Sequence, residues 1–185
     1  MPIFSQTIQD LVANKSPQPY YRLIENTITT AQSSFFPTGA LPRSISAWIN
    51  PTNYVSTDYA NICGYGADTT SDLFVMTFRS TGNLGLWGSS DNYDSGIAVE
   101  LNKWQHVVVT YDGTNIIGYV DGVQGTTTAK SYTTTESAFV IGSGPTGYYQ
   151  NFEGSISNVR VYNLALSHTE VKELYSGASV PFKYK

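Results

Sequence analysis

Residues 102–124, NKWQHVVVTYDGTNIIGYVDGVQ, decide the fold of this chain. Between residues 107 and 111, apolar side chains occupy every second position, as they do along a β-strand. The Asp-Gly pairs at 112–113 and 121–122 suit the positive φ that tight turns require. The stretch therefore predicts a three-stranded antiparallel meander with strands at 104–111 and 115–121. Turn geometry accounts for both aspartates without a catalytic role.

Two side chains that often carry chemistry are predicted to be structural. His106 lies in the middle of the first strand with valines beside it, so we expect a histidine with satisfied ring nitrogens rather than a metal ligand or a base. Cys63 is the single cysteine, which excludes an intrachain disulfide and a cysteine-based zinc site. In its apolar setting it is predicted to be a small buried hydrophobe.

Length and composition favour one all-β domain. The chain has 185 residues, is rich in threonine, serine and tyrosine, and has only 13% charged residues. The net charge is −4 and no cluster of lysines and arginines occurs, so nucleic-acid binding is not expected. No apolar run approaches the roughly 18 residues of a membrane-spanning helix, so membrane insertion is not expected either.

Further strands follow from alternation and from apolar runs between turn signals. They are predicted at 20–25, 43–50, 59–66, 72–80, 83–88, 137–144 and 153–163. Residues 26–34 are predicted as a short strand or a loop, and residues 89–96 as a loop. Many short strands of this kind indicate a sandwich or a barrel. The predicted core includes Trp48, Val107, Val109, Ile141 and Val159.

Two helices are predicted, one near each end of the chain. Residues 4–13 have apolar side chains at helical spacing, and the prolines of SPQP (16–19) end that helix. Ser167 and Glu170 form a capping box at the start of a second helix at 167–175. Gly177 is placed to stop it.

Three segments resemble the concanavalin A-like, laminin-G-type jelly-roll domains. The central hairpin is WQHVVVTYDG followed by YVDG, the early core strand is FPTGALPRSISAWINP (36–51), and the closing part is FEGSISNVRVYNLALSHTEVKELYSG (152–177). The resemblance covers residues 19–177. It implies a two-sheet antiparallel jelly-roll sandwich, flanked by an N-terminal helical arm at 1–18 and a C-terminal tail at 178–185.

Calcium sites of this family depend on acidic segments that this chain lacks. Only about ten residues, none of them acidic, fill the gap between the opening strand and FPTG. Ser157 and Asn158 stand where the family usually has an acidic pair in the closing strand. Both changes remove the hard oxygen ligands that calcium prefers. No cofactor is therefore expected, and the metal ligands, if calcium does bind, stay unassigned.

An enzyme is not expected. Glycosidases on this fold place two carboxylates on one strand so that both enter the cleft at a defined separation. No predicted strand has acids at that spacing, and Asp91 and Asp94, the nearest pair, lie in a predicted loop. A glycoside hydrolase is therefore kept only as the third hypothesis.

Two segments carry the aromatic and planar polar side chains that bind sugars. The first, around 87–94, offers Trp87, Asp91, Asn92, Tyr93 and Asp94, and the second, around 146–151, offers Tyr148 and Tyr149. These residues are the predicted contacts to a glycan or a partner protein. For Trp87 the alternative is a place in the core, and for the tyrosines it is half-buried cover.

The leading functional hypothesis is a non-catalytic binding module of a virion surface, as capsid decoration or tail adhesin. The chain starts with methionine without a secretory signal, so we expect synthesis in a host cytoplasm. Its opening residues also resemble the start of such modules in phage structural proteins. Expected partners are capsid or tail proteins, cell-surface glycans, or further copies in a homo-oligomer, reached through the N-terminal helix or the tail. The alternative is an extracellular or cellular lectin domain.

Overall fold

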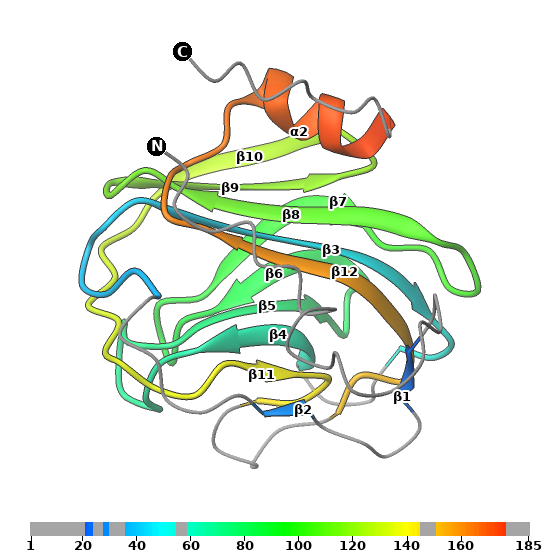
Figure 1. Cartoon of the computed structure of the whole chain (residues 1–185), viewed down its shortest axis with the longest axis horizontal. Coiled ribbons are helices and arrows are strands. Elements are labelled where there is room, and N and C mark those ends of the chain that lie inside the picture. Colours follow the sequence, from blue (N-terminus) through cyan, green and yellow to red (C-terminus); the bar gives the residue numbers. More distant parts are fainter. Residues whose placement is uncertain (1–20, 24–27, 30–35, 55–58, 145–150, 177–185) are drawn as a thin grey trace, which may run out of the picture.

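The computed structural model describes residues 21–23, 28–29, 36–54, 59–144 and 151–176. These residues form two antiparallel six-stranded sheets that pack face to face, with a helix beside them (Figure 1). The predicted all-β jelly-roll sandwich with a C-terminal helix is confirmed. The predicted helix at 4–13, the arm and the tail lie outside the described residues.

Each sheet combines strands from distant parts of the chain. In the first sheet the order is β1 (Tyr21–Leu23), β12 (Gly154–Tyr162), β3 (Arg43–Pro51), β8 (Gln105–Tyr111), β9 (Asn115–Val120) and β10 (Val123–Ala129). In the second sheet it is β2 (Ile28–Thr29), β11 (Val140–Ile141), β4 (Tyr59–Tyr65), β5 (Phe74–Arg79), β6 (Asn83–Trp87) and β7 (Tyr93–Ala98). The helix α2 spans His168–Ser176.

The core lies between the two sheets and contains the side chains that alternation predicted. Four of the five predicted core residues are buried there: Val107, Val109, Ile141 and Val159. Cys63 is also fully buried, and burial raises the pKa of its thiol. No helix within the described ranges has the length and apolar character needed to cross a membrane.

The prediction for Trp48 was wrong. Its neighbours Ala47 and Ile49 face the core, so the two-residue period of the strand turns Trp48 to the outer side of the first sheet. There it is half-buried, with its ring 5.4 Å from that of His106 and 6.0 Å from that of Tyr175. It therefore joins the sheet to α2 rather than filling the sandwich.

His106 is buried on the same outer side. Its ring was predicted to have both nitrogens hydrogen-bonded, and this prediction was wrong. It is 3% exposed and stacks against Tyr175 of α2 at 6.4 Å. Its Nδ1 atom has no hydrogen-bond partner. Burial and the nearby positive charge of Arg160 lower the pKa of His106 to about 4, against an opposing effect of Asp121.

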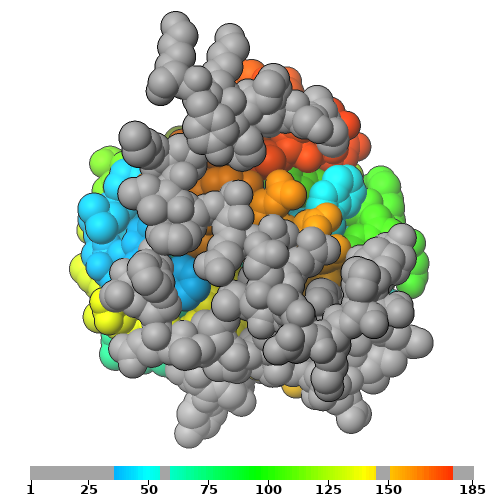
Figure 2. All heavy atoms as spheres, viewed as in Figure 1, coloured from blue at the N-terminus to red at the C-terminus, as the bar shows by residue number. Residues whose placement is uncertain are grey.

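The helix begins as its capping box predicts. The Glu170 carboxylate accepts hydrogen bonds from the Ser167 amide and hydroxyl, each at 2.7 Å, and the Ser167 hydroxyl accepts one from the Glu170 amide. Val171 is fully buried against Val108 and Tyr119 of the first sheet. In the space-filling view, the orange-red atoms of α2 lie at the top of the molecule (Figure 2).

Turn geometry explains both aspartates of the meander. Asp121 and Gly122 have φ of 51° and 75°, and Asp121 also accepts a hydrogen bond from the His106 amide at 2.8 Å. Asp112 instead accepts from the amides of Thr114 and Asn115, at 2.8 and 2.6 Å. The structural interpretation of these carboxylates is confirmed.

Residues 93–96 were predicted to lie in a loop, but the structure places them in the edge strand β7. The strand packs against β10, the edge strand of the other sheet. The Tyr93 hydroxyl donates to the Thr126 carbonyl at 2.6 Å and accepts from the Gly118 amide at 2.8 Å. A Cβ on Gly125 would lie 2.4 Å from the Ser95 carbonyl, so glycine allows this close approach. We call this contact between β7 and β10 the seam.

A buried arginine fixes one end of the sandwich. Arg43 is 0% exposed, and its guanidinium donates to the carbonyls of Leu41 at 3.1 Å, Pro37 at 2.8 Å and Gly39. It also lies over the Phe74 ring, with its central carbon 4.8 Å from the ring centroid. Arg43 therefore ties the segment at 37–41 to the core.

Replacing Val109 with alanine is expected to lower the free energy of unfolding by about 2 kcal/mol, because it removes buried methyl groups and leaves a cavity. Chemical denaturation of the two proteins measures this change. Val123 is the matched control, since it is a strand valine that is 60% exposed, and its replacement should change stability by less than about 0.5 kcal/mol. Equal effects at both positions would contradict the placement of the core.

Candidate functional site

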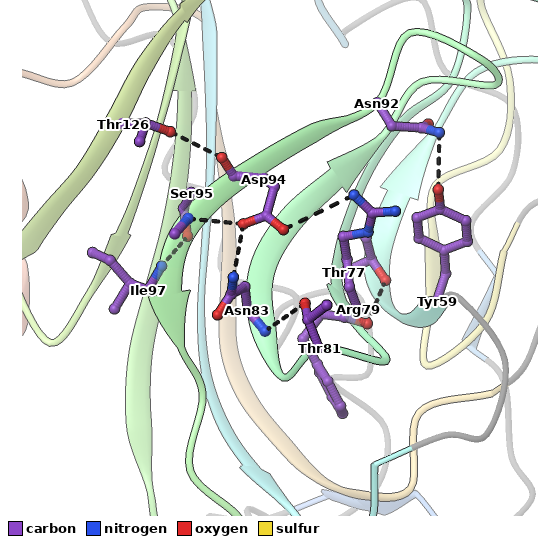
Figure 3. Close-up of polar contacts among 12 residues, drawn as sticks. Tyr59, Thr77, Arg79, Thr81, Asn83, Asn92, Asp94, Ser95, Ile97 and Thr126 are labelled. Carbon is purple, nitrogen blue, oxygen red and sulfur yellow. Dashed lines mark hydrogen bonds and ion pairs between the residues drawn. The ribbon is translucent and has the colours of Figure 1, made fainter.

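The candidate site lies on the outer face of the second sheet, the side that faces away from the core. The antiparallel register brings Thr77 of β5, Gly85 of β6 and Asp94 of β7 into one row across the sheet. Arg79 follows Thr77 on the same face. Its guanidinium points across β6 toward the Asp94 carboxylate, and the nearest nitrogen and oxygen are 3.9 Å apart (Figure 3).

Gly85 allows this pair to form. A Cβ at this position would lie 2.5 Å from the Tyr93 carbonyl oxygen and 3.7 Å from the Arg79 side chain. The absence of a side chain therefore leaves a path for Arg79 over the middle strand. Charged groups from β5 and β7 meet because the strand between them has glycine in the same row.

An aromatic pair supports Arg79 from β4 and β6. The central carbon of the guanidinium lies 5.4 Å from the centroid of the Tyr59 ring, which is a cation–π contact. The rings of Tyr59 and Trp87 are stacked, with centroids 6.0 Å apart. The Asn92 amide donates to the Tyr59 hydroxyl at 2.9 Å (Figure 3). The Gly88 amide donates to Asn92 at 3.0 Å. These contacts fix the orientation of the Tyr59 ring.

The Asp94 carboxylate is held on the opposite side. Its Oδ1 accepts from the Asn83 side-chain amide at 3.1 Å and from the Gly96 amide at 2.8 Å. Its Oδ2 faces Arg79. The side chains of Arg79 and Asp94 are each 31% exposed, so a molecule in solution can reach both of them.

The structure brings some of the sequence-predicted site residues together and separates others. Asn92 and Asp94 belong to the candidate site. Trp87 belongs to it as buried support, since it is only 3% exposed. Asp91 is directed elsewhere, with its carboxylate 2.6 Å from the Lys130 ammonium. Tyr93 is 2% exposed in the core at the seam, so its ring has no free face for a sugar.

The other predicted tyrosines, Tyr148 and Tyr149, lie outside the described residues. Three residues of the site were missed by sequence reasoning: Tyr59, Arg79 and Asn83. Each is an outward position on a strand that had been predicted, so alternation alone could have placed them on a common face. Their proximity to one another follows only from the strand order.

The structure adds one observation on metals. Within the described part of the chain, no three side chains of histidine, cysteine, aspartate or glutamate come close enough together to hold an ion. The metal assignment therefore stays open, as in the sequence.

The fold and this face define a lectin/glucanase-like β-sandwich. The family model described as "Concanavalin A-like lectin/glucanases superfamily" matches residues 25–172, and the chain belongs to this family. The resemblance inferred from the hairpin and the closing strand is thereby confirmed. No curated protein matches the sequence at a significant level.

Solved structures share the fold at low sequence identity. Domain 4 of AbnA, an extracellular arabinanase from Geobacillus stearothermophilus in complex with arabinotriose, is 19% identical with a TM-score of 0.63, over 84% of this chain and 80% of that one. A SAP-like pentraxin from Limulus polyphemus is 18% identical with a TM-score of 0.60, over 84% of both chains. A putative carbohydrate binding protein from Bacteroides ovatus is 22% identical with a TM-score of 0.59, over 80% of this chain and 44% of that one.

Proposed function

We propose that this domain is a non-catalytic carbohydrate-binding module and that its ligand contacts the outer face of the second sheet. The observation that carries the proposal is the partly exposed pair of Arg79 and Asp94, fixed in place by Tyr59 and Asn83. Planar charged and amide groups in fixed positions are the groups that bind sugar hydroxyls.

The comparisons support this proposal at the level of the fold. The AbnA domain was solved with arabinotriose, and the Bacteroides ovatus protein is described as a putative carbohydrate binding protein. Both share the two-sheet architecture. The residues that would carry binding in this chain rest on its own geometry.

The absence of catalysis is part of the proposal. A glycosidase needs two carboxylates that face one scissile bond. Here Asp91 is paired with Lys130, while Asp94 is held by Asn83 and the Gly96 amide. Asp91 and Asp94, the pair singled out by the sequence, thus have separate partners. We expect no release of reducing ends from polysaccharides incubated with the protein.

Replacing both Arg79 and Asp94 with alanine is expected to weaken glycan binding by about 10- to 100-fold, because charge-assisted hydrogen bonds to the ligand are lost. A glycan array identifies the ligand, and titration calorimetry then compares the variants. The matched control replaces Glu100 and Lys103, an exposed ion pair that lies outside the candidate site. The nitrogen and oxygen of this pair are 2.7 Å apart. This control should bind like the wild type.

Two outcomes would contradict the proposal. If the array shows no glycan bound by the wild type, carbohydrate binding is wrong. If the Arg79 and Asp94 variant keeps full affinity while a glycan is bound, the ligand lies elsewhere on the domain. Thermal melting of each variant shows whether it is folded, so that unfolding is not taken for loss of a contact.

The virion role stays a prediction. It places the domain on a virion surface, attached to capsid or tail proteins through the arm at 1–18 or the tail at 178–185. Both segments lie outside the described residues. Glycan binding by the outer face is compatible with a tail adhesin and with an extracellular lectin.

A further inference from the structure

We propose that Arg79 and Asp94 together recognise a vicinal diol of a neutral saccharide. This inference rests on the proposed function and deepens it, because it names the class of ligand and the atoms that select it. Arg79 would donate to one hydroxyl oxygen, and Asp94 would accept from the adjacent hydroxyl.

Arg79 has hydrogen-bonding capacity that its described contacts do not use. Its nearest contact to Asp94, at 3.9 Å, is longer than a hydrogen bond. Within the described residues its guanidinium makes that ion pair and the cation–π contact with Tyr59, and neither uses an N–H group in a hydrogen bond. A guanidinium has five N–H donors, so donors remain for a ligand.

The side chains of Arg79 and Asp94 both have a fixed orientation. Asp94 uses Oδ1 for Asn83 and for the Gly96 amide, which turns Oδ2 toward Arg79. The guanidinium is kept against the Tyr59 ring. Because both groups are held by neighbours, little side-chain entropy is lost when a ligand binds.

The arrangement of this pair matches a vicinal diol. A donor and an acceptor lie side by side on an accessible surface, and each hydroxyl of a diol can accept or donate. Two adjacent hydroxyls therefore satisfy the guanidinium and the carboxylate at the same time. A single hydroxyl would have to accept from the guanidinium and donate to the carboxylate at once, whereas two adjacent hydroxyls give each group a partner of its own.

Charge decides between neutral and acidic saccharides. A ligand carboxylate placed on Arg79 would also lie close to the Asp94 carboxylate, and two like charges at this distance repel each other. The pair has no net charge, so a neutral ligand meets no such penalty. We therefore expect neutral sugars to be preferred over uronic acids.

The experiment uses immobilised linear arabinan, dextran and amylose as neutral probes, with polygalacturonate as the carboxylated probe. Each neutral polysaccharide is presented intact and after periodate oxidation followed by borohydride reduction, which cleaves the carbon–carbon bond between vicinal hydroxyls. The full-length wild-type chain is expected to bind an intact neutral probe and to lose about 10-fold or more in affinity on the oxidised form.

Two single variants test the roles of the pair. Asp94→Asn is expected to weaken binding to the neutral probe about 10-fold and to raise the ratio of polygalacturonate to neutral binding, because it removes the repelling charge. Arg79→Lys keeps the charge but loses the planar set of donors, and it should also weaken neutral binding about 10-fold. Lys103→Ala is the control and should change neither value.

The outcomes separate this inference from the proposed function. Wild-type preference for polygalacturonate, equal binding to oxidised and intact probe, or unchanged affinity in both variants would each overturn the diol inference while carbohydrate binding stands. Failure to bind any polysaccharide or any glycan of the array would overturn the proposed function itself.

Discussion

Replacing Arg43 with alanine is expected to lower the free energy of unfolding by about 4 kcal/mol, the largest effect of any single substitution considered for this protein. The arginine is fully buried, and its guanidinium donates to carbonyls of the segment at 37–41 and to the Tyr65 hydroxyl at 3.2 Å. Alanine would remove this donor from the Leu41 and Gly39 carbonyls and would leave the Pro37 carbonyl with only the Tyr65 hydroxyl, at 2.7 Å. It would also leave a cavity between the rings of Phe74 and Tyr111.

Denaturant unfolding of the wild type and of Arg43→Ala measures this loss. Arg43→Lys separates the two causes, because lysine fills much of the volume but cannot reproduce the planar set of donors. We expect it to be destabilised as well, by about half as much. Lys103→Ala, at a side chain that is 50% exposed, should stay within about 0.5 kcal/mol of the wild type. A loss below about 1 kcal/mol for Arg43→Ala would contradict the structural role of the arginine.

Acidification from pH 7 to pH 4 is expected to cost about 3 kcal/mol of stability through His106 alone. Its pKa falls from 6.5 to about 4 in the folded protein, chiefly because of burial. Between these two values the unfolded chain binds a proton that the folded chain does not. Stability therefore decreases as the pH falls through this range, and it is fully present above pH 6.5.

The variant His106→Gln isolates this contribution, since glutamine carries no charge at any of these pH values. Unfolding free energies of both proteins are measured at half-unit steps from pH 7 to pH 4. We expect the difference between wild type and variant to change by about 3 kcal/mol over the range, whereas contributions of carboxylates cancel. Parallel curves would show that His106 titrates normally and is not buried as described.

The sequence was sufficient for features that depend on local spacing. The alternation of β3 and β8, the positive φ of Asp121 and Gly122 and the capping box of Ser167 and Glu170 follow from residues close in the chain. Each obeys a period or a turn geometry that leaves few alternatives. The resemblance to the family then supplied the two-sheet jelly-roll architecture.

Other features depend on contacts between distant segments. Residues 93–96 appear loop-like in the sequence because they contain polar residues and glycine. They form a strand because Tyr93 reaches across to Thr126 and Gly118. The side of the sheet on which Trp48 lies was misjudged because apolar residues occur on both faces of β3. Its partner ring, Tyr175, comes from the helix near the other end of the chain.

The candidate site shows the same limit. Aromatic composition pointed to Trp87 and Tyr93, yet both are buried. Arg79 and Asp94 are 15 positions apart and meet because Gly85 lies between them in the sheet. No local sequence pattern indicates that these two side chains lie close together. The strand order and the register have to be known before the charges can be paired.

The seam between β7 and β10 has a consequence for crowded surfaces. Edge strands with unpaired backbone groups are the usual starting points for aggregation between copies of a β-protein. On one side of this sandwich, the two edges are instead turned onto each other through Tyr93 and Thr126. On the other side, the described parts of the edge strands β1 and β2 span three and two residues. The seam therefore keeps these two edges of the domain from joining the sheets of neighbouring copies at high local concentration.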